Sequence, residues 1–197
     1  MIDDSNVGGI NVWKKFFLMK NVENAIDRVT QYFEIPLKDA FYVIILNSKK
    51  YEGGRKAVYL DKDGYNKKSM IVHEVTHALL KLKEHNFELE GIAMLMEYKF
   101  INDTKVEKER YIRFRNRNDC DTYPIQYLIE NDQLYYPNTK IGRSVYMQSG
   151  LFYLFLDEKY GRKKMLEFYT QGVRRIESVY GVPLDSLDAA WQKWLLQ

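Results

Sequence analysis

Two of the chain's three histidines stand four residues apart, in the stretch HEVTH at residues 73–77. The stretch lies inside a longer pattern, residues 67–85, in which apolar residues recur at helical spacing. This pattern predicts a helix over 67–85. Side chains at i and i+4 lie on the same helix face, one turn apart. The fold must therefore build a helix that presents two imidazoles side by side.

The remaining periodicity predicts an α+β fold. Helical spacing predicts further helices over 21–34, 89–100, 144–159, 162–171 and 185–196. Asn66 is expected to cap the 67–85 helix, and Gly161 to end the 144–159 helix. The helix over 185–196 is expected to be capped, with Trp191 and Leu195 as apolar anchors. Two short β-branched and aromatic runs, 41–46 and 56–60, predict strands, and Gly53-Gly54 predicts a turn between them. Residues 102–143 are polar and turn-rich, with little periodicity. We therefore expect a small N-terminal β-region followed by a mainly helical lobe.

The chain is expected to form one domain, because no Ser/Gly-rich linker and no internal repeat interrupts its 197 residues. The domain is divided into a β-containing part over about 1–66, two central helices over about 67–101 and a C-terminal helical part over about 102–197. The only cysteine, Cys120, excludes an internal disulfide framework and predicts a lone structural thiol.

Charge and hydropathy exclude several partners. No apolar run approaches the roughly 18 residues of a membrane span. A net charge of +3 is too small to indicate nucleic acid by itself, and the mixed-sign run at 105–119 predicts a solvated helix or connector. A nucleic-acid contact through residues 105–117 is the weaker alternative. The N-terminus has no signal-peptide pattern, which predicts a cytoplasmic protein, or a secreted one whose signal was removed.

The histidine pair indicates a metal site. His73 and His77 can converge on one Zn²⁺ at roughly 2.0–2.1 Å. Glu74 follows the first ligand and points aside from the metal, so it is placed to take a proton from a water that the metal activates. The alternative interpretation is a pair of structural histidines on an amphipathic helix.

A catalytic zinc needs a third protein ligand and one open position. Position 83 is a lysine, so the metzincin spacing fails, and His85 lies two turns from His77. The remaining candidates are the carboxylates Glu84, Glu88, Glu90 and Glu97. Glu90 is the best of them, because it begins the next helix and Gly91 permits close helix approach. The alternative role of Glu90 is to stabilise its helix N-terminus.

These motifs resemble those of the gluzincin metallopeptidases. HEVTHALL followed by FELEGIAMLMEY is most similar to the peptidase-MA-like group, whose second motif has an aromatic residue, two further residues and Glu-Gly-x-Ala. SVYMQSGLFYLFLDEKYG and PLDSLDAAWQKWL are similar to later helices of that family. The resemblance covers about residues 21–196, and only the two zinc motifs are specific.

The resemblance implies a zincin-like fold and a role for each matching residue. His73, His77 and Glu90 match the three ligands of one Zn²⁺ ion, and Glu74 matches the general base. Tyr146, or alternatively Tyr153, matches the phenol that stabilises the oxyanion; a core tyrosine is the alternative interpretation.

Two further points follow from the resemblance. Strand 56–60 matches the edge strand that aligns a peptide, with a plain structural strand as the alternative. Several gluzincins carry an acidic residue one turn after the third ligand, where this chain has Met94. The first histidine then needs another partner, for example a backbone carbonyl or Glu97.

The sequence therefore predicts a zinc-dependent peptidase that acts on a peptide or protein substrate through a metal-activated water. The alternative is an inactive gluzincin-like scaffold that binds proteins or peptides.

Overall fold

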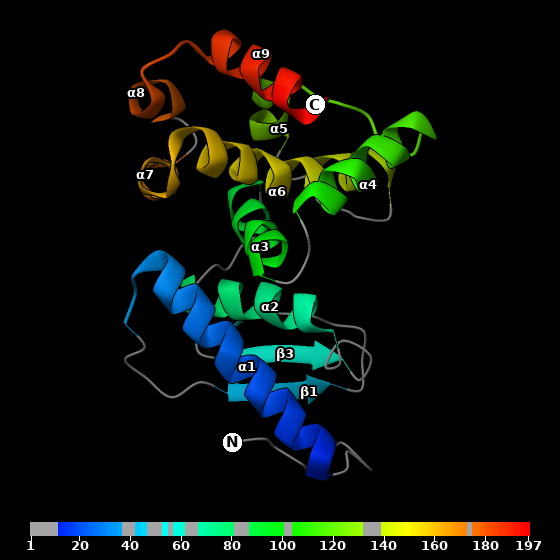
Figure 1. Cartoon of the computed structure of the whole chain (residues 1–197), viewed down its shortest axis with the longest axis vertical. Coiled ribbons are helices and arrows are strands. Elements are labelled where there is room, and N and C mark those ends of the chain that lie inside the picture. The colour runs from blue at the N-terminus through cyan, green and yellow to red at the C-terminus, as the bar shows by residue number, and fades with distance from the viewer. Residues whose placement is uncertain are drawn as a thin grey trace. The chain divides into compact units, whose positions relative to one another are not determined.

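The computed structural model describes residues 12–36, 42–46, 53–54, 57–61, 67–80, 87–100, 104–131, 139–172 and 175–197 (Figure 1). Helices dominate this part of the chain: α1 (Val12–Phe33), α2 (Lys68–Leu80), α3 (Phe87–Phe100), α4 (Thr104–Asn116), α5 (Ile125–Glu130), α6 (Lys140–Tyr160), α7 (Arg162–Gln171), α8 (Ile176–Tyr180) and α9 (Leu184–Leu195). The strands are β1 (Tyr42–Leu46), β2 (Gly53–Gly54) and β3 (Ala57–Asp61). A mainly helical chain with a small β-region is thereby confirmed.

Contacts between Cα atoms divide the chain into two compact units, Met1–Glu84 and His85–Gln197. The first unit contains α1, α2 and the three strands, and the second contains the remaining helices. The single-domain boundaries stay a prediction.

The sheet of the first unit corrects two expectations. Its strand order is β1-β3-β2, with β1 parallel and β2 antiparallel to β3. Strand 56–60 was expected at an edge, but β3 is the central strand, because it pairs with β1 along its length and with β2 at Ala57 and Val58. The glycine pair expected to form a turn is itself strand β2, since glycine can pair through its backbone groups alone.

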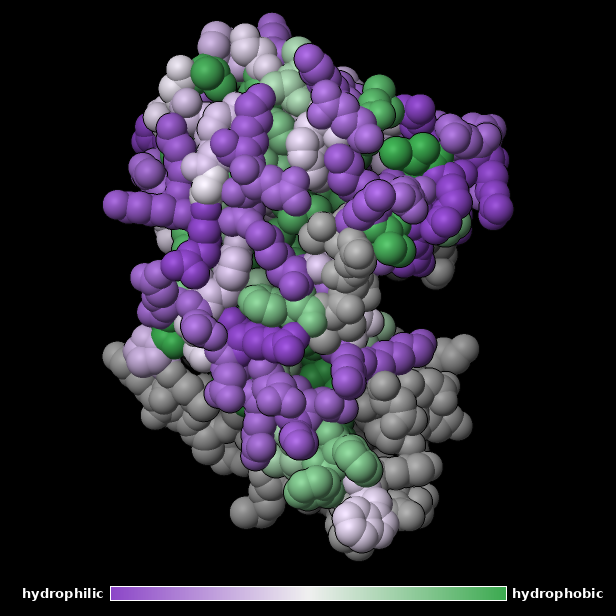
Figure 2. Space-filling view, viewed as in Figure 1, coloured by the Kyte–Doolittle hydropathy of each residue, from purple (hydrophilic) through white to green (hydrophobic). Residues whose placement is uncertain are grey.

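Helix α2 is buried over most of its length. It contacts α1, β2 and β3, and every residue from Ile71 to Ala78 is buried. Helix α1 supplies a stripe of buried side chains at helical spacing: Leu18, Val22, Ala25, Ile26 and Val29. Helix α1 is longer than the helix predicted over 21–34 and begins at Val12. The prediction missed its first turns because Trp13, Phe16 and Phe17 lie off this stripe and do not follow the core pattern. These three residues are exposed, and the space-filling view shows apolar residues at the surface over this end of α1 (Figure 2).

Helix α6 is central to the second unit, where it contacts α3, α7 and α9 (Figure 1). Fourteen of its 21 residues are buried, as expected for a helix that is apolar on most sides. The predicted anchors of the last helix are confirmed, because Trp191 and Leu195 are fully buried. The Trp191 ring lies 5.6 Å from Phe152 and 5.8 Å from Phe155, between ring centroids.

Two glycines set the close approach of α3 and α6. A Cβ atom at Gly91 would lie 2.5 Å from Cδ2 of Tyr153 and 3.1 Å from the Ser149 carbonyl oxygen. A Cβ atom at Gly150 would lie 2.4 Å from Cβ of Met94. Neither position accepts a side chain without movement of the helices. The prediction that Gly91 permits a close helix approach is therefore confirmed, with α6 as the partner.

The turn-rich expectation for 102–143 is wrong, because α4 and α5 lie there. Both make hydrogen bonds to residues outside the helix. The Tyr111 hydroxyl of α4 donates to the Asp121 carbonyl oxygen at 3.1 Å. The Ile125 amide at the start of α5 donates to Oδ1 of Asp188 in α9 at 2.8 Å. The solvated helix expected within 105–119 is confirmed as α4.

The end of α6 agrees with the sequence-based prediction, whereas the start of α9 differs from it. Gly161 ends α6 as predicted, with a φ of 86° that favours glycine. The last helix was expected to carry its own cap, but none of its side chains caps it. Instead the Leu184 amide donates to Oε1 of Glu177 in α8 at 2.7 Å. The expected helix N-cap at Asn66 and the end of the 67–85 helix after Leu80 lie outside the described residues.

Candidate metal centre

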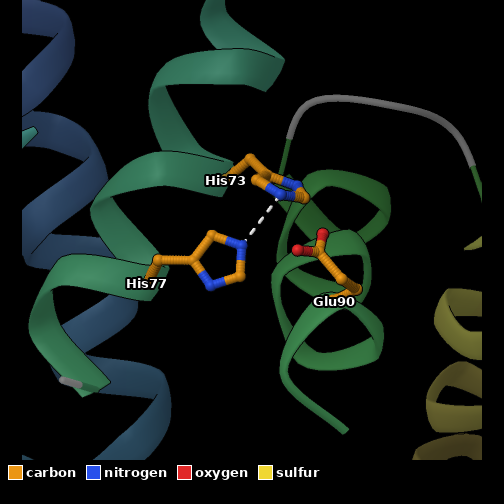
Figure 3. A group of neighbouring side chains, drawn as sticks. All are labelled: His73, His77 and Glu90. Carbon is orange, nitrogen blue, oxygen red and sulfur yellow. Dashed lines mark hydrogen bonds between the residues drawn. The ribbon is translucent and has the colours of Figure 1, made fainter. Parts of the chain in front are cut away.

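Helix α2 places its two histidines on one face, as the spacing predicts. The two Nε2 atoms lie 3.0 Å apart, and the ring centroids are 4.7 Å apart (Figure 3). Each histidine is only 5% exposed. At 3.0 Å one imidazole donates its Nε2 proton to the other, which requires opposite tautomers in the two rings. The same two atoms are the natural ligands of a metal ion.

Glu90 completes a group of three ligand atoms. It lies in the first turn of α3 and is 4% exposed. Its carboxylate points toward the two imidazoles (Figure 3), and the ligand atoms of the three residues lie within 4.8 Å of one another. Of the other predicted carboxylates, Glu88 and Glu97 are in the described part of the chain and do not belong to this group. Glu84 and His85 lie outside the described residues.

The donor set fits Zn²⁺. Two atoms at 2.0–2.1 Å from a tetrahedral ion lie about 3.3 Å apart, close to the 3.0 Å between the two Nε2 atoms. Two imidazoles and one carboxylate are a common ligand set of catalytic zinc, with a fourth position open. A buried carboxylate is costly unless a cation or hydrogen bonds compensate it, and a divalent cation among these three residues would do so. The three side chains therefore lie close enough together to bind a metal ion.

Glu74 lies next to the first histidine on α2 and is 6% exposed. Successive residues of an α-helix are rotated by about 100°, so its carboxylate leaves the backbone in a different direction from the His73 imidazole. A buried acid at this position is unusual for a structural residue. Its role as general base stays a prediction.

The two tyrosines considered for the oxyanion differ in environment. Tyr146 on α6 is partly exposed, and its carbonyl oxygen accepts a hydrogen bond from the Ser149 hydroxyl at 2.7 Å. Tyr153, two turns later, is fully buried and packs its ring on Gly91, the residue after Glu90. Tyr153 is thus a packing residue of the α3–α6 contact. The proposed oxyanion role of Tyr146 stays a prediction.

Met94 has a packing explanation. Its Cβ faces Gly150 of α6, and the residue is 7% exposed. A carboxylate here would be buried between two helices, where it is costly. Burial raises the pKa of Tyr98 and of Glu107, and the nearby carboxylate of Glu97, the suggested alternative partner of His73, adds to both shifts. Sequence reasoning missed Gly150, whose only signal is a small residue within an apolar helix.

Cys120 is a structural thiol, as expected. It is 1% exposed, and burial raises its pKa, which keeps the sulfur protonated at neutral pH. Its Sγ contacts Sδ of Met147 at 4.0 Å.

Comparison with protein-family models, with curated proteins and with solved structures gave no match to this chain. Among the helices in the described ranges, none combines the length and the apolar character needed to cross a bilayer.

Proposed function

We propose that this chain is a zinc-dependent peptidase of the gluzincin type, most similar to the peptidase-MA-like group, with a zincin-like fold. The observation that carries the proposal is the buried group His73, His77 and Glu90, with ligand atoms within 4.8 Å of one another. The acid Glu74, which completes the HExxH pattern, is buried on the same helix.

The proposed site divides its work among these residues. His73, His77 and Glu90 would hold one Zn²⁺. When bound, the ion supplies Lewis acidity, which polarises a carbonyl and makes a nearby water easier to deprotonate. Glu74 takes the proton from the attacking water and later delivers it to the leaving amine. Tyr146 donates its hydroxyl proton to the developing oxyanion.

Met94 favours one alternative, an inactive gluzincin-like scaffold that binds a protein or peptide. Where several gluzincins carry an acidic residue, this chain has an apolar side chain packed on α6. Without that acid, a ligating histidine depends on another hydrogen-bond partner for its orientation. The alternative predicts no turnover, with or without bound metal.

Metal content and hydrolysis test the proposal together. We expect wild-type protein to bind one zinc and His77→Ala or Glu90→Ala to lose it, measured by elemental analysis after dialysis. Glu74→Gln should keep the zinc and lower peptide-library cleavage by about 10²–10⁴-fold. Glu88→Gln is the matched control, because Glu88 lies near Gly172 and Tyr169 on α7 and is partly exposed.

Each outcome separates the candidates. Cleavage lost in Glu74→Gln but retained in Glu88→Gln supports the peptidase. Zinc-loaded wild-type protein that cleaves no peptide supports the scaffold. Unimpaired hydrolysis by zinc-loaded Glu74→Gln protein contradicts the assigned base, and failure of wild-type protein to bind zinc contradicts the peptidase.

A further inference from the structure

The first turn of α3 carries Glu90, the third member of the candidate metal group (Figure 3). The start of a helix has fewer hydrogen bonds within the helix than its middle, because its first amides have no carbonyl partner one turn earlier. Helical structure alone therefore does little to fix the position of this carboxylate. Packing of α3 within its own unit has to supply the rest.

A cluster of buried rings anchors this turn on α6. Phe87, the first residue of α3, is 1% exposed, and its ring centroid lies 5.7 Å from that of Phe152 and 6.3 Å from that of Tyr153. The Tyr153 ring lies 5.8 Å from Phe168 of α7, again between centroids. Aromatic rings at such distances attract one another in addition to the effect of burial. We call Phe87, Phe152, Tyr153 and Phe168 the α3 anchor cluster.

Tyr153 is the member of the cluster that faces the residue after the ligand. A Cβ atom at Gly91 would lie 2.5 Å from Cδ2 and 2.8 Å from Cε2 of the Tyr153 ring. The ring therefore occupies the space that a side chain at Gly91 would fill. Tyr153 is fully buried, so its ring cannot turn aside into solvent. The Cα atoms of Gly91 and Glu90 are about 3.8 Å apart, and the ring thus limits how far the Glu90 backbone can move toward α6.

A metal ion makes this limit important. Ligand distances in a metal site vary by only about 0.2 Å, and the surrounding residues have to hold a ligand within about 0.5 Å of its working position. Loss of the ring beside Gly91 would open a space larger than that tolerance, into which the first turn of α3 can move. Residues that orient a metal ligand typically change metal affinity by about 10–100-fold.

The two histidines do not depend on the cluster in the same way. Both imidazoles belong to α2, and their position side by side follows from that one helix. A shift in the first turn of α3 therefore changes one of the three ligands and leaves the histidine pair in place. The expected effect passes through Glu90 alone.

We propose that Tyr153 is a positioning residue of the zinc site, whose ring holds the carboxylate of Glu90 in place through Gly91. The inference rests on the proposed function and adds to it a residue outside the three ligands. The ring carbons of Tyr153 carry this role, because they are the atoms that face Gly91.

Zinc affinity of the full chain, measured by competition with a chromophoric chelator, tests the proposal. Tyr153→Leu removes the ring and should raise the zinc Kd about 10–100-fold. Tyr153→Phe keeps Cδ2 and Cε2 and should bind zinc as wild type does. Phe155→Leu is the matched control, because Phe155 is fully buried on the same helix and packs its ring on Trp191 and Trp194 of α9. Its zinc Kd should stay within about twofold of the wild-type value.

A double-mutant cycle separates positioning from stability. Tyr153→Leu should weaken zinc binding only while Glu90 is present. In a Glu90→Ala protein, whose two imidazoles are titrated directly with zinc, it should change the zinc Kd by no more than about twofold. Circular dichroism of the metal-free proteins measures the folded fraction. Phe87→Leu weakens the same cluster from α3 and replaces Tyr153→Leu in both measurements if that variant does not fold.

The outcomes separate this inference from the proposed function. Zinc-binding wild-type protein with an unchanged zinc Kd in Tyr153→Leu would overturn the inference alone, and so would equal weakening with and without Glu90. Equal weakening in Phe155→Leu would assign the effect to general loss of packing, and weakening in Tyr153→Phe would assign it to the hydroxyl; both contradict the proposed role of the ring. Failure of wild-type protein to bind zinc would contradict the peptidase itself.

Discussion

One methyl group added at Gly150 is expected to push α3 and α6 apart. The new Cβ atom would lie 2.4 Å from Cβ of Met94 and 2.8 Å from Cε2 of Tyr98. A Cβ atom is fixed to the backbone, so rotation of the Met94 side chain does not relieve the contact. Tyr98 is 1% exposed and has little space into which to move. The helices must therefore separate.

The size of the effect follows from these distances. Ordinary contact begins at 3.4 Å, so the two Cβ atoms must move apart by 1.0 Å. Forced separation of a well-packed interface costs about 1–3 kcal/mol, and two immobile neighbours favour the upper part of that range. Replacing glycine by alanine within a helix recovers about 1 kcal/mol of helix propensity. We expect Gly150→Ala to lower the free energy of unfolding by about 1–2 kcal/mol.

Thermal and urea unfolding measure this change. A loss of this size corresponds to a decrease in Tm of roughly 2–8 °C for a chain of this length. Ser149→Ala is the matched control, because it changes the neighbouring buried residue without adding volume and removes only the hydrogen bond to the Tyr146 carbonyl within α6. A Gly150→Ala protein as stable as the Ser149→Ala control would refute the argument that this contact sets the helix spacing.

Three other predictions concern stability. Burial raises the pKa of Tyr111 to about 12, above the value of about 10 in an unfolded chain. The folded state therefore loses stability as pH rises from 10 toward 12. In urea titrations, the free energy of unfolding of Tyr111→Phe should fall less than that of wild type between pH 9 and 11. Equal losses would contradict this. Asp188→Ala removes the acceptor of the Ile125 amide and should lower the free energy of unfolding by about 1–2 kcal/mol. Asp185 is an exposed residue of the same helix, and Asp185→Ala should lower the free energy of unfolding by about 0.5 kcal/mol. Removal of zinc by a chelator should lower the Tm of wild-type protein, since a ligand at 100 times its Kd contributes about 2.7 kcal/mol, and should leave the Tm of His77→Ala unchanged.

The histidine pair is the part of the candidate site that sequence predicts most directly. Residues four apart on a helix share a face whatever the rest of the fold does, and the Nε2 atoms of His73 and His77 lie 3.0 Å apart. Glu90 is different, because it belongs to another helix. Its selection among several carboxylates came from its place before Gly91 and from a family resemblance, and the ligand-atom distances agree with that selection.

The errors in the predicted fold share a cause. The start of helix α5 is held by a hydrogen bond from the Ile125 amide to Asp188, which lies 63 residues later in the chain. The sequence of α5 has little apolar periodicity, so it does not by itself predict a helix. Strand β3 was expected at an edge because its own residues do not show how many neighbours a strand has. Pairing partners are a property of the assembled sheet.

Local sequence determined the elements whose cause is local: the helical face of the histidines, the end of α6 at Gly161 and the anchors of α9. Their geometry depends on residues within one or two turns. Tertiary structure alone decided how closely α3 approaches α6 and which aromatic residues of α1 stay exposed. These features depend on distances between separate elements, and packing of the whole unit determines those distances.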